Sequence, residues 1–127
     1  MFSEKAKKNA DACRFCWMCR HLCPVGLRTG REVNTARAKG LLVSMEKRGF
    51  PMDADSARVM FECTLCTACE NDCATGYRPT LFIREARGEA IARGLAPDYA
   101  LRAIDAVEAE GNPLGLPRAE KFDLLKD

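Results

Sequence analysis

Eight cysteines stand in two runs of identical spacing, and no other feature constrains the fold of this chain as strongly. Each run has the form C-x2-C-x2-C-x3-C, and the second repeats the first with every cysteine displaced by 50 residues. The runs consist of Cys13, Cys16, Cys19 and Cys23, and of Cys63, Cys66, Cys69 and Cys73. Eight thiolates at this spacing are the ligand count of two four-iron clusters. The sequence therefore predicts two [4Fe-4S] clusters and, with them, electron transfer.

The same spacing predicts which cysteines share a cluster. In bacterial proteins with two four-iron clusters, the fourth cysteine of each run binds the cluster of the other run, and a proline follows it. Pro24 follows the first run, whereas Ala74 takes the place of proline after the second, which alters the local turn and not the ligand count. We expect one cluster on Cys13, Cys16, Cys19 and Cys73, and the other on Cys63, Cys66, Cys69 and Cys23.

Two other uses of eight cysteines compete with this prediction. Four disulfides would suit a secreted chain, but three cysteines spaced three residues apart, twice over, form a metal-binding loop more readily than a cystine framework. Two zinc sites with four thiolates each would also need eight cysteines. Zinc ribbons bring CxxC pairs from two separate places, however, so the third cysteine of each run would have no role. A zinc-stabilised interaction module stays open as an alternative.

The composition fits a small domain that gains stability from bound metal. The chain has 127 residues, the size of one domain. Much of its apolar content is Ala and Cys, which bury little area, so clusters would add folding free energy. The formal charge of +2 counts every cysteine as neutral. Two clusters of roughly −2 each would bring the total to about −2, so the mild basicity does not indicate nucleic-acid binding.

The sequence shows no sign of export or of membrane insertion. The N-terminal stretch MFSEKAKKNADAC has basic residues but lacks the apolar segment of a secretory signal. No stretch approaches the roughly 18 apolar residues of a membrane span. We therefore expect a cytoplasmic protein, which could still be membrane-associated through a partner.

The repeat extends beyond the cysteines. Laying residues 13–44 over residues 63–94 gives further matches: Gly26 with Gly76, Arg28 with Arg78, Ala36–Arg37 with Ala86–Arg87, Val33 with Ile83, and Leu41 with Ile91. Such self-similarity indicates an internal duplication, in which each half is a cysteine loop followed by a helix.

Apolar periodicity and end signals predict the helices that follow the two runs. In the second half a helix is expected from Pro79–Thr80 to Gly94, with an apolar side of Ile83, Ala86, Ala90 and Ile91. In the first half it is expected from a Thr29 cap to Gly49, with Val33, Ala36, Gly40 and Leu41 on its apolar side. Glycine inside a helix costs about 1 kcal/mol of propensity, so Gly40 could mark a close packing contact.

Other helices are predicted beside these two. Asp53 can cap one that runs through Phe61 into Cys63, and the first dozen residues are expected to form its equivalent. Pro97 can begin a further helix that carries Leu101, Ile104 and Val107 and stops at Gly111. No segment shows the alternation of a strand, so the fold class expected is all-α.

Residues near the cysteines have structural and functional interpretations. Gly26 and Gly76 suit plain turns or positions where a side chain would crowd a cluster. Trp17, inside the first run, could fill the core, shield a cluster from water or mark a docking face. His21, the only histidine, is expected to be solvated or capping because eight cysteines already satisfy two clusters. Several arginines gather here, and collectively they could offset anionic clusters and recognise an acidic partner: Arg14, Arg20, Arg28, Arg37, Arg78, Arg84 and Arg87.

The sequence offers no catalytic constellation. It has neither a GxGxxG nor a GxxxxGK[ST] signature, and it has no spare cysteine or second histidine for nucleophilic chemistry. We therefore expect a non-catalytic electron-transfer subunit.

The stretches CRFCWMCRHLCPVG and CTLCTACENDCATGYRPTLFIREAR resemble the α-helical ferredoxin domain over about residues 10–95. This domain occurs in the iron–sulfur subunits of succinate dehydrogenase, fumarate reductase, and glycolate and lactate oxidases, and in the small iron–sulfur component of heterodisulfide reductase. With both runs complete, the chain is most similar to the heterodisulfide reductase type, which has two four-iron clusters. The resemblance implies a duplicated helix–cluster loop–helix fold with an extra C-terminal helix, over residues 1–111.

The resemblance also implies partners. It indicates a hetero-oligomeric subunit that relays single electrons between a flavin-containing dehydrogenase or reductase subunit and another acceptor, with the flavin on the partner chain. The segment GNPLG looks like the one that, in fused relatives, leads into cysteine-rich CCG domains. Residues 112–127 would then be a turn-rich tail that contacts a partner. A heterodisulfide-type reductase, in which this chain feeds a CCG-domain catalytic subunit, is the alternative.

Overall fold

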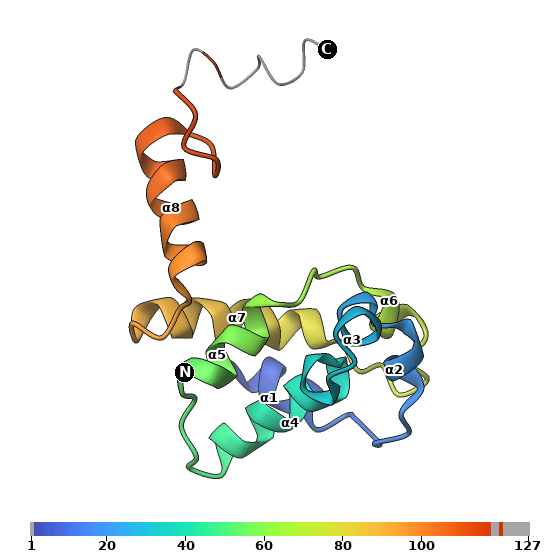
Figure 1. The fold of residues 1–127 in the computed structure, drawn as a ribbon. Helices are drawn as coiled ribbons and strands as arrows, with labels where there is room; N and C mark the ends of the chain where they lie inside the picture. The colour runs from blue at the N-terminus through green and yellow to red at the C-terminus, as the bar shows by residue number, and fades with distance from the viewer. Residues whose placement is uncertain (1, 118–119, 121–127) are drawn as a thin grey trace.

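A computed structural model describes residues 2–117 and 120, and within that range the secondary structure is helical, without strands (Figure 1). This confirms the all-α fold class expected from the sequence. In chain order the elements are α1 (Glu4–Ala10), α2 (Met18–Leu22), α3 (Pro24–Thr29), the 3-10 turn η1 (Glu32–Asn34), α4 (Ala36–Lys47), α5 (Ala54–Phe61), α6 (Ala68–Asn71), α7 (Pro79–Ala92) and α8 (Asp98–Glu110).

The helices that precede the cysteine runs are equivalent in the two halves. The Ser3 hydroxyl caps α1 by accepting the backbone N–H of Ala6 at 3.2 Å. The Asp53 carboxylate caps α5 by accepting the backbone N–H of Ser56 at 2.8 Å. Each cap satisfies an N–H that has no partner inside its helix. The two caps are 50 residues apart, so the duplication seen in the sequence is present in the backbone.

The helices that follow the runs differ between the halves. In the second half, α7 begins at Pro79, as predicted. In the first half, Pro24 begins the short helix α3, which ends at Gly30 in the left-handed conformation, with φ of 66°. The predicted cap at Thr29 is therefore wrong, because Thr29 is the last residue of α3. The long helix α4 starts instead after Thr35, whose side chain accepts the N–H of Ala38.

Helices α1, α4, α5 and α7 pack around a core that is small and rich in alanine (Figure 1). The buried cluster consists of Phe2, Ala6, Ala10, Ala36, Val43, Met52, Ala57, Met60, Tyr77, Phe82, Ile83, Ala86 and Ala90. Leu41 and Ile91 were expected on the apolar sides of their helices, but each is 41% exposed. The buried stripes run through Ala36, Lys39, Gly40 and Val43 in α4 and through Phe82, Ile83, Ala86 and Ala90 in α7, and the two predicted residues lie beside them.

The two halves meet most closely where α4 passes the start of α7. Gly40 of α4 faces Tyr77, which is 2% exposed and donates its hydroxyl to the carbonyl of Ala36 at 2.6 Å. A Cβ at position 40 would lie 2.2 Å from Tyr77 Oη. The close packing contact suggested for Gly40 is thereby confirmed.

Helix α8 projects away from the bundle (Figure 1). It follows Pro97 and ends at Gly111, which has φ of 73°, as the end signals predicted. None of its residues is buried. The Asn112 side chain closes the next turn by accepting the N–H groups of Leu114 and Leu116; residues 118–119 and 121–127 of the predicted tail lie outside the described residues. No helix in the described part of the chain is long and apolar enough to span a bilayer.

Candidate iron–sulfur site

The two cysteine loops have the same backbone conformation. Phe15 and Leu65 have φ of 55° and 54°, and Trp17 and Thr67 have φ of 69° and 63°. Residues other than glycine rarely adopt such angles, and doing so costs free energy. In both loops the strained turn directs an N–H at the first thiol, since Phe15 N donates to Cys13 Sγ and Leu65 N donates to Cys63 Sγ, each at 3.4 Å. An N–H aimed at sulfur can donate a hydrogen bond to a metal-bound thiolate.

The cysteines gather around two cavities at the end of the bundle where α2 and α6 pack together. The first cysteine cavity, of about 340 Å³, is lined by Cys13, Cys16, Cys19 and Cys73, with Cys69 also at its wall. The second cysteine cavity is much smaller, at about 30 Å³, and is lined by Cys23, Cys63, Cys66 and Cys69. Each cavity thus holds three cysteines of one run and the fourth cysteine of the other.

The donor set of each cavity is that of a four-iron cluster, because it includes three thiols of one run and the fourth of the other. All eight thiols are free of disulfides. Among the described residues, no three Cys, His, Asp or Glu side chains are grouped closely enough to hold one metal ion. The lining of each cavity includes four thiols, the number of ligands that a cubane needs. Cys69 lines both cavities, so groups bound in the two cavities would be neighbours.

The fourth cysteine of each run has its own local hydrogen bonds. Cys23 Sγ accepts the N–H of Gly26 at 3.3 Å, and Cys73 Sγ lies 3.2 Å from the Thr75 hydroxyl. The two duplicated glycines serve different purposes. Gly26 lies within α3, and a Cβ there would contact Thr35 Cγ2 at 3.3 Å and Cys23 Sγ at 3.5 Å. Gly76 is a turn glycine with φ of 69° and open space around it.

The thiols differ in how readily they ionise. Burial raises the pKa of Cys69 to about 12, and the neighbouring thiols of Cys63 and Cys19 add to the effect. Burial also raises the pKa of Cys19. At Cys73 burial acts in the same direction, but hydrogen bonds from Thr75 and from the backbone of Tyr77 together outweigh it and lower the pKa. Metal ligands must be deprotonated. Bound iron would therefore have to offset the largest rise in thiol pKa at Cys69.

A buried lysine points to a negative charge in the second cysteine cavity. Lys39 lines this cavity, is 1% exposed and donates its ammonium to the backbone carbonyl of Asn34. Burial lowers the pKa of Lys39, while Cys63, Cys23 and Glu62 act against the shift. Within residues 2–117 and 120, no carboxylate forms an ion pair with it. A buried ammonium without a counter-ion is unfavourable, so this site suits an anionic group.

Trp17 forms an outer wall of the first cysteine cavity. Its ring is stacked against the guanidinium of Arg37, whose central carbon lies 3.7 Å from the ring centroid. Arg37 is also paired with Glu32 at 2.8 Å. Trp17 is 45% exposed, so it does not fill the core, and shielding and docking are the interpretations that its position supports. His21 is exposed, as expected.

Arg87 occupies the position that corresponds to Arg37 in the repeat, and it holds the start of the second cysteine loop through hydrogen bonds to backbone carbonyls. Its guanidinium donates to the carbonyls of Met60 at 3.0 Å, Phe61 at 3.3 Å and Cys63. Phe61 also presents its ring 5.5 Å from the Arg87 guanidinium. One side chain therefore joins α7 to the end of α5 and to the start of the second cysteine loop.

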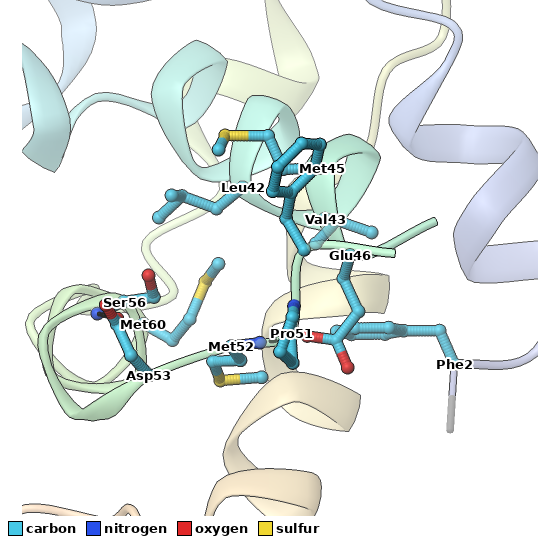
Figure 2. A pocket seen from close by; sticks show the side chains of 11 residues that line it. Phe2, Leu42, Val43, Met45, Glu46, Pro51, Met52, Asp53, Ser56 and Met60 are labelled. Atoms are coloured by element: carbon cyan, nitrogen blue, oxygen red, sulfur yellow. Dashed lines mark hydrogen bonds between the residues drawn. The ribbon is translucent and has the colours of Figure 1, made fainter. Parts of the chain in front are cut away.

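A further pocket lies away from the cysteines, between α4, the segment after it and α5 (Figure 2). It measures about 260 Å³, and its lining is mostly apolar, with Met45, Met52 and Met60 among the side chains. Its carboxylates are engaged within the protein: Glu46 accepts from Met52 N and pairs with Arg93, and Asp53 caps α5.

Sequence reasoning missed Lys39 and Tyr77 as parts of the site. Lys39 stands on the buried stripe between Ala36 and Val43, and a lysine in such a stripe is the signal that could have revealed it. Tyr77 lines the first cysteine cavity and is one of only two tyrosines. The only signal in the sequence was Gly40, the glycine inside a helix that leaves space for the Tyr77 side chain.

Comparison with known proteins agrees with this site. Residues 9–77, which include both cysteine runs, match the family model of the 4Fe-4S dicluster domain. No curated protein and no solved structure gives a significant match. The match covers more than half of the 127-residue chain, so the chain belongs to the 4Fe-4S dicluster domain family. It is an electron-transfer iron–sulfur protein, and this family favours [4Fe-4S] clusters over the zinc alternative.

Proposed function

We propose that this chain is a subunit that binds two [4Fe-4S] clusters and relays single electrons between a flavin-containing dehydrogenase or reductase subunit and another acceptor. Cluster 1 would be held by Cys13, Cys16, Cys19 and Cys73, and cluster 2 by Cys63, Cys66, Cys69 and Cys23. The observation that carries the proposal is that each of the two cavities is lined by three cysteines of one run and the fourth cysteine of the other, with Cys69 in the lining of both.

The protein's own residues would prepare the site for one-electron chemistry. When bound, the clusters would supply one-electron couples. The N–H groups of Phe15 and Leu65 would stabilise thiolate charge, which raises a cluster's reduction potential. Trp17 would limit water access on one side, and Cys69, in the wall between the cavities, would keep the two electron-carrying groups adjacent.

Two exposed apolar surfaces support the proposal that this chain binds a partner chain. Phe15, Trp17 and Met18 are 51%, 45% and 58% exposed beside the first cysteine cavity. Helix α8 carries Leu101, Ile104 and Val107 on a projecting element in which no residue is buried. We propose that these surfaces contact the subunits that donate and accept electrons, with residues 112–127 as a further contact and the whole in the cytoplasm. A membrane-bound partner could bring the complex to a membrane.

The identity of the partner chain would show which of two kinds of complex this subunit belongs to. The similarity to glycolate oxidase iron–sulfur subunits favours a flavoprotein partner, and the similarity to the small iron–sulfur component of heterodisulfide reductase favours a CCG-domain catalytic partner. The Asn112 turn lies within GNPLG, a segment that resembles the one preceding CCG domains in fused relatives. Chains that copurify with a tagged protein from its native source would decide the question: a flavoprotein alone supports the first, and a CCG protein supports the second.

Cluster content and ligand variants test the core of the proposal. Anaerobically reconstituted protein should contain about eight iron and eight sulfide per chain and show two reducible clusters by EPR. Cys73→Ser should alter the cluster held by Cys13, Cys16 and Cys19, and Cys23→Ser the other. Zinc without sulfide would exclude the iron–sulfur assignment, and a Cys73→Ser effect on the cluster of its own run would exclude the crossed ligation.

A further inference from the structure

We propose that Lys39 is the counter-ion of cluster 2 and makes it the cluster of higher reduction potential, so that an electron entering this protein settles there. The inference rests on the proposed function, because it requires an anionic cluster in the second cysteine cavity. It adds an internal direction of electron flow, from cluster 1 to cluster 2.

Lys39 is held in the wall of the second cysteine cavity and cannot reach solvent. It lies on the buried stripe of α4, is 1% exposed and lines the cavity together with Cys23, Cys63 and Cys69. The carbonyl of Asn34 accepts from its ammonium. Asn34 is also 1% exposed, so both the donor and the acceptor of this hydrogen bond are buried.

Among the described residues, no carboxylate forms an ion pair with this ammonium. An ammonium has three N–H donors, and in the described chain only the Asn34 carbonyl accepts from it. Glu62 is the carboxylate that acts on Lys39 electrostatically, but it pairs with Arg58 at 2.9 Å and does not form an ion pair with Lys39. A buried cation is retained when a negative partner is present, and the four thiolates and cluster of this cavity are the remaining candidate.

The first cysteine cavity has no equivalent of this arrangement in the described structure. Position 89, which corresponds to Lys39 in the 50-residue register, is a glutamate on α7. Two cations line the first cavity. The charge of Arg37 is shared with Glu32 at 2.8 Å and with the Trp17 ring, and Arg14 is exposed to solvent and donates to the carbonyl of Asp11 at 3.3 Å. Reduction adds a negative charge to a cluster, and an unshared buried positive charge favours that step more than a shared one.

The test is a redox titration of the loaded protein followed by EPR. The signals are assigned to their clusters with Cys16→Ser and Cys66→Ser, which change one ligand in each loop. In the wild type, cluster 2 should have the higher midpoint potential. Lys39→Met keeps an unbranched side chain, one atom shorter than lysine, and removes its charge. It should lower the midpoint of cluster 2 by at least 59 mV, a tenfold change in the equilibrium constant for reduction, and shift cluster 1 less.

Lys47→Met is the matched control on the same helix. Lys47 stands at the exposed end of α4 and pairs with Asp11, so its removal should leave both midpoints unchanged because water and salt screen it. Equal shifts of both clusters in Lys39→Met, no shift of cluster 2, or a lower wild-type potential for cluster 2 would each overturn the inference.

A measurement on the wild type covers the case in which Lys39→Met does not load cluster 2. With lysine labelled by 15N at Nζ, pulsed EPR of reduced cluster 2 should show a 15N hyperfine coupling, because Lys39 is the lysine that lines a cysteine cavity. Its absence would overturn the inference. A protein that binds no iron would overturn the proposed function as well, whereas two clusters whose potentials are indifferent to Lys39 would overturn the inference alone.

Discussion

Gly40 and the hydroxyl of Tyr77 approach each other so closely that a Cβ on residue 40 would lie 2.2 Å from Tyr77 Oη. Tyr77 cannot easily move away, since it is buried and bonded to the Ala36 carbonyl at 2.6 Å. The contact joins α4 of the first half to the residues just before α7 in the second half, and Tyr77 also lines the first cysteine cavity.

Gly40→Ala should therefore destabilise the protein. Overpacking a core costs about 1–3 kcal/mol, and the gain in helix propensity offsets about 1 kcal/mol of this. We expect the free energy of unfolding to fall by about 1–2 kcal/mol in anaerobic denaturant titrations. Gly88→Ala in α7 is the control, because a Cβ there meets nothing within 4 Å, and it should stabilise by up to about 1 kcal/mol. Equal effects of the two substitutions would contradict this account.

The second-half and C-terminal helices could be predicted because single residues mark their ends. Asp53 begins α5, Pro79 begins α7, and Pro97 and Gly111 bound α8, each through local chemistry that acts wherever the residue lies. The first half was harder. Its 50-residue register with the second half suggested one continuous helix, whereas Gly30 in the left-handed conformation ends α3 and moves the next start to Thr35.

The eight ligands could be identified from spacing, but their surroundings could not. Spacing along the chain carries no information about which helix faces a cavity, so the approach of Lys39 to the second run, 24 residues away in sequence, is a tertiary effect. The same applies to Leu41 and Ile91, which share the hydrophobicity of core residues and lie beside the buried stripe rather than on it.

Arg87→Met should loosen the second cysteine loop. It removes donors to the carbonyls of Met60, Phe61 and Cys63, and hydrogen bonds from charged groups contribute about 1.5–3 kcal/mol. We expect the free energy of unfolding, measured by thermal unfolding under anaerobic conditions, to fall by about 2–3 kcal/mol. Cluster 2 should be lost before cluster 1. Arg87→Lys should restore only part of this free energy, because lysine lacks the planar guanidinium with its several fixed donors. Arg84→Met, at an exposed position one turn earlier in α7, should have little effect; a comparable loss there would argue against the bracing role.

Trp17→Ser should make cluster 1 more sensitive to oxygen. The indole ring forms an outer wall of the first cysteine cavity and is held by Arg37 at 3.7 Å; removing it admits water and oxygen to the cluster. The rate of loss of the cluster-1 EPR signal in air should rise, while cluster 2 decays as before. Phe50→Ser removes another exposed aromatic, one that lines the pocket in Figure 2, and should leave both rates unchanged. Faster decay of both clusters in Trp17→Ser would indicate general unfolding instead of lost shielding.

Removal of iron should cost the fold much of its cooperativity. Six of the thirteen residues in the buried cluster are alanines, and several cysteines pack against it, so apolar burial per residue is low. Metal binding to such a site contributes directly to folding. After chelation under reducing conditions, far-UV circular dichroism should show a lower and broader thermal transition, and reloading with iron and sulfide should restore it. An apoprotein that melts as sharply and at the same temperature would show that the helices hold the fold alone.

Thr67→Gly should stabilise the protein, which is uncommon for a substitution that removes a side chain. Thr67 has φ of 63°, an angle that is unfavourable for a β-branched residue and free of steric cost for glycine. The strain of a left-handed residue is about 1–2 kcal/mol, and glycine's greater freedom in the unfolded chain offsets part of it. We expect the free energy of unfolding of the loaded protein to rise by up to about 1 kcal/mol. Thr64→Gly is the matched control in the same loop, because Thr64 does not have a positive φ, and it should be neutral or destabilising. If Thr67→Gly destabilised as much as Thr64→Gly, the second cysteine loop would not be strained at Thr67.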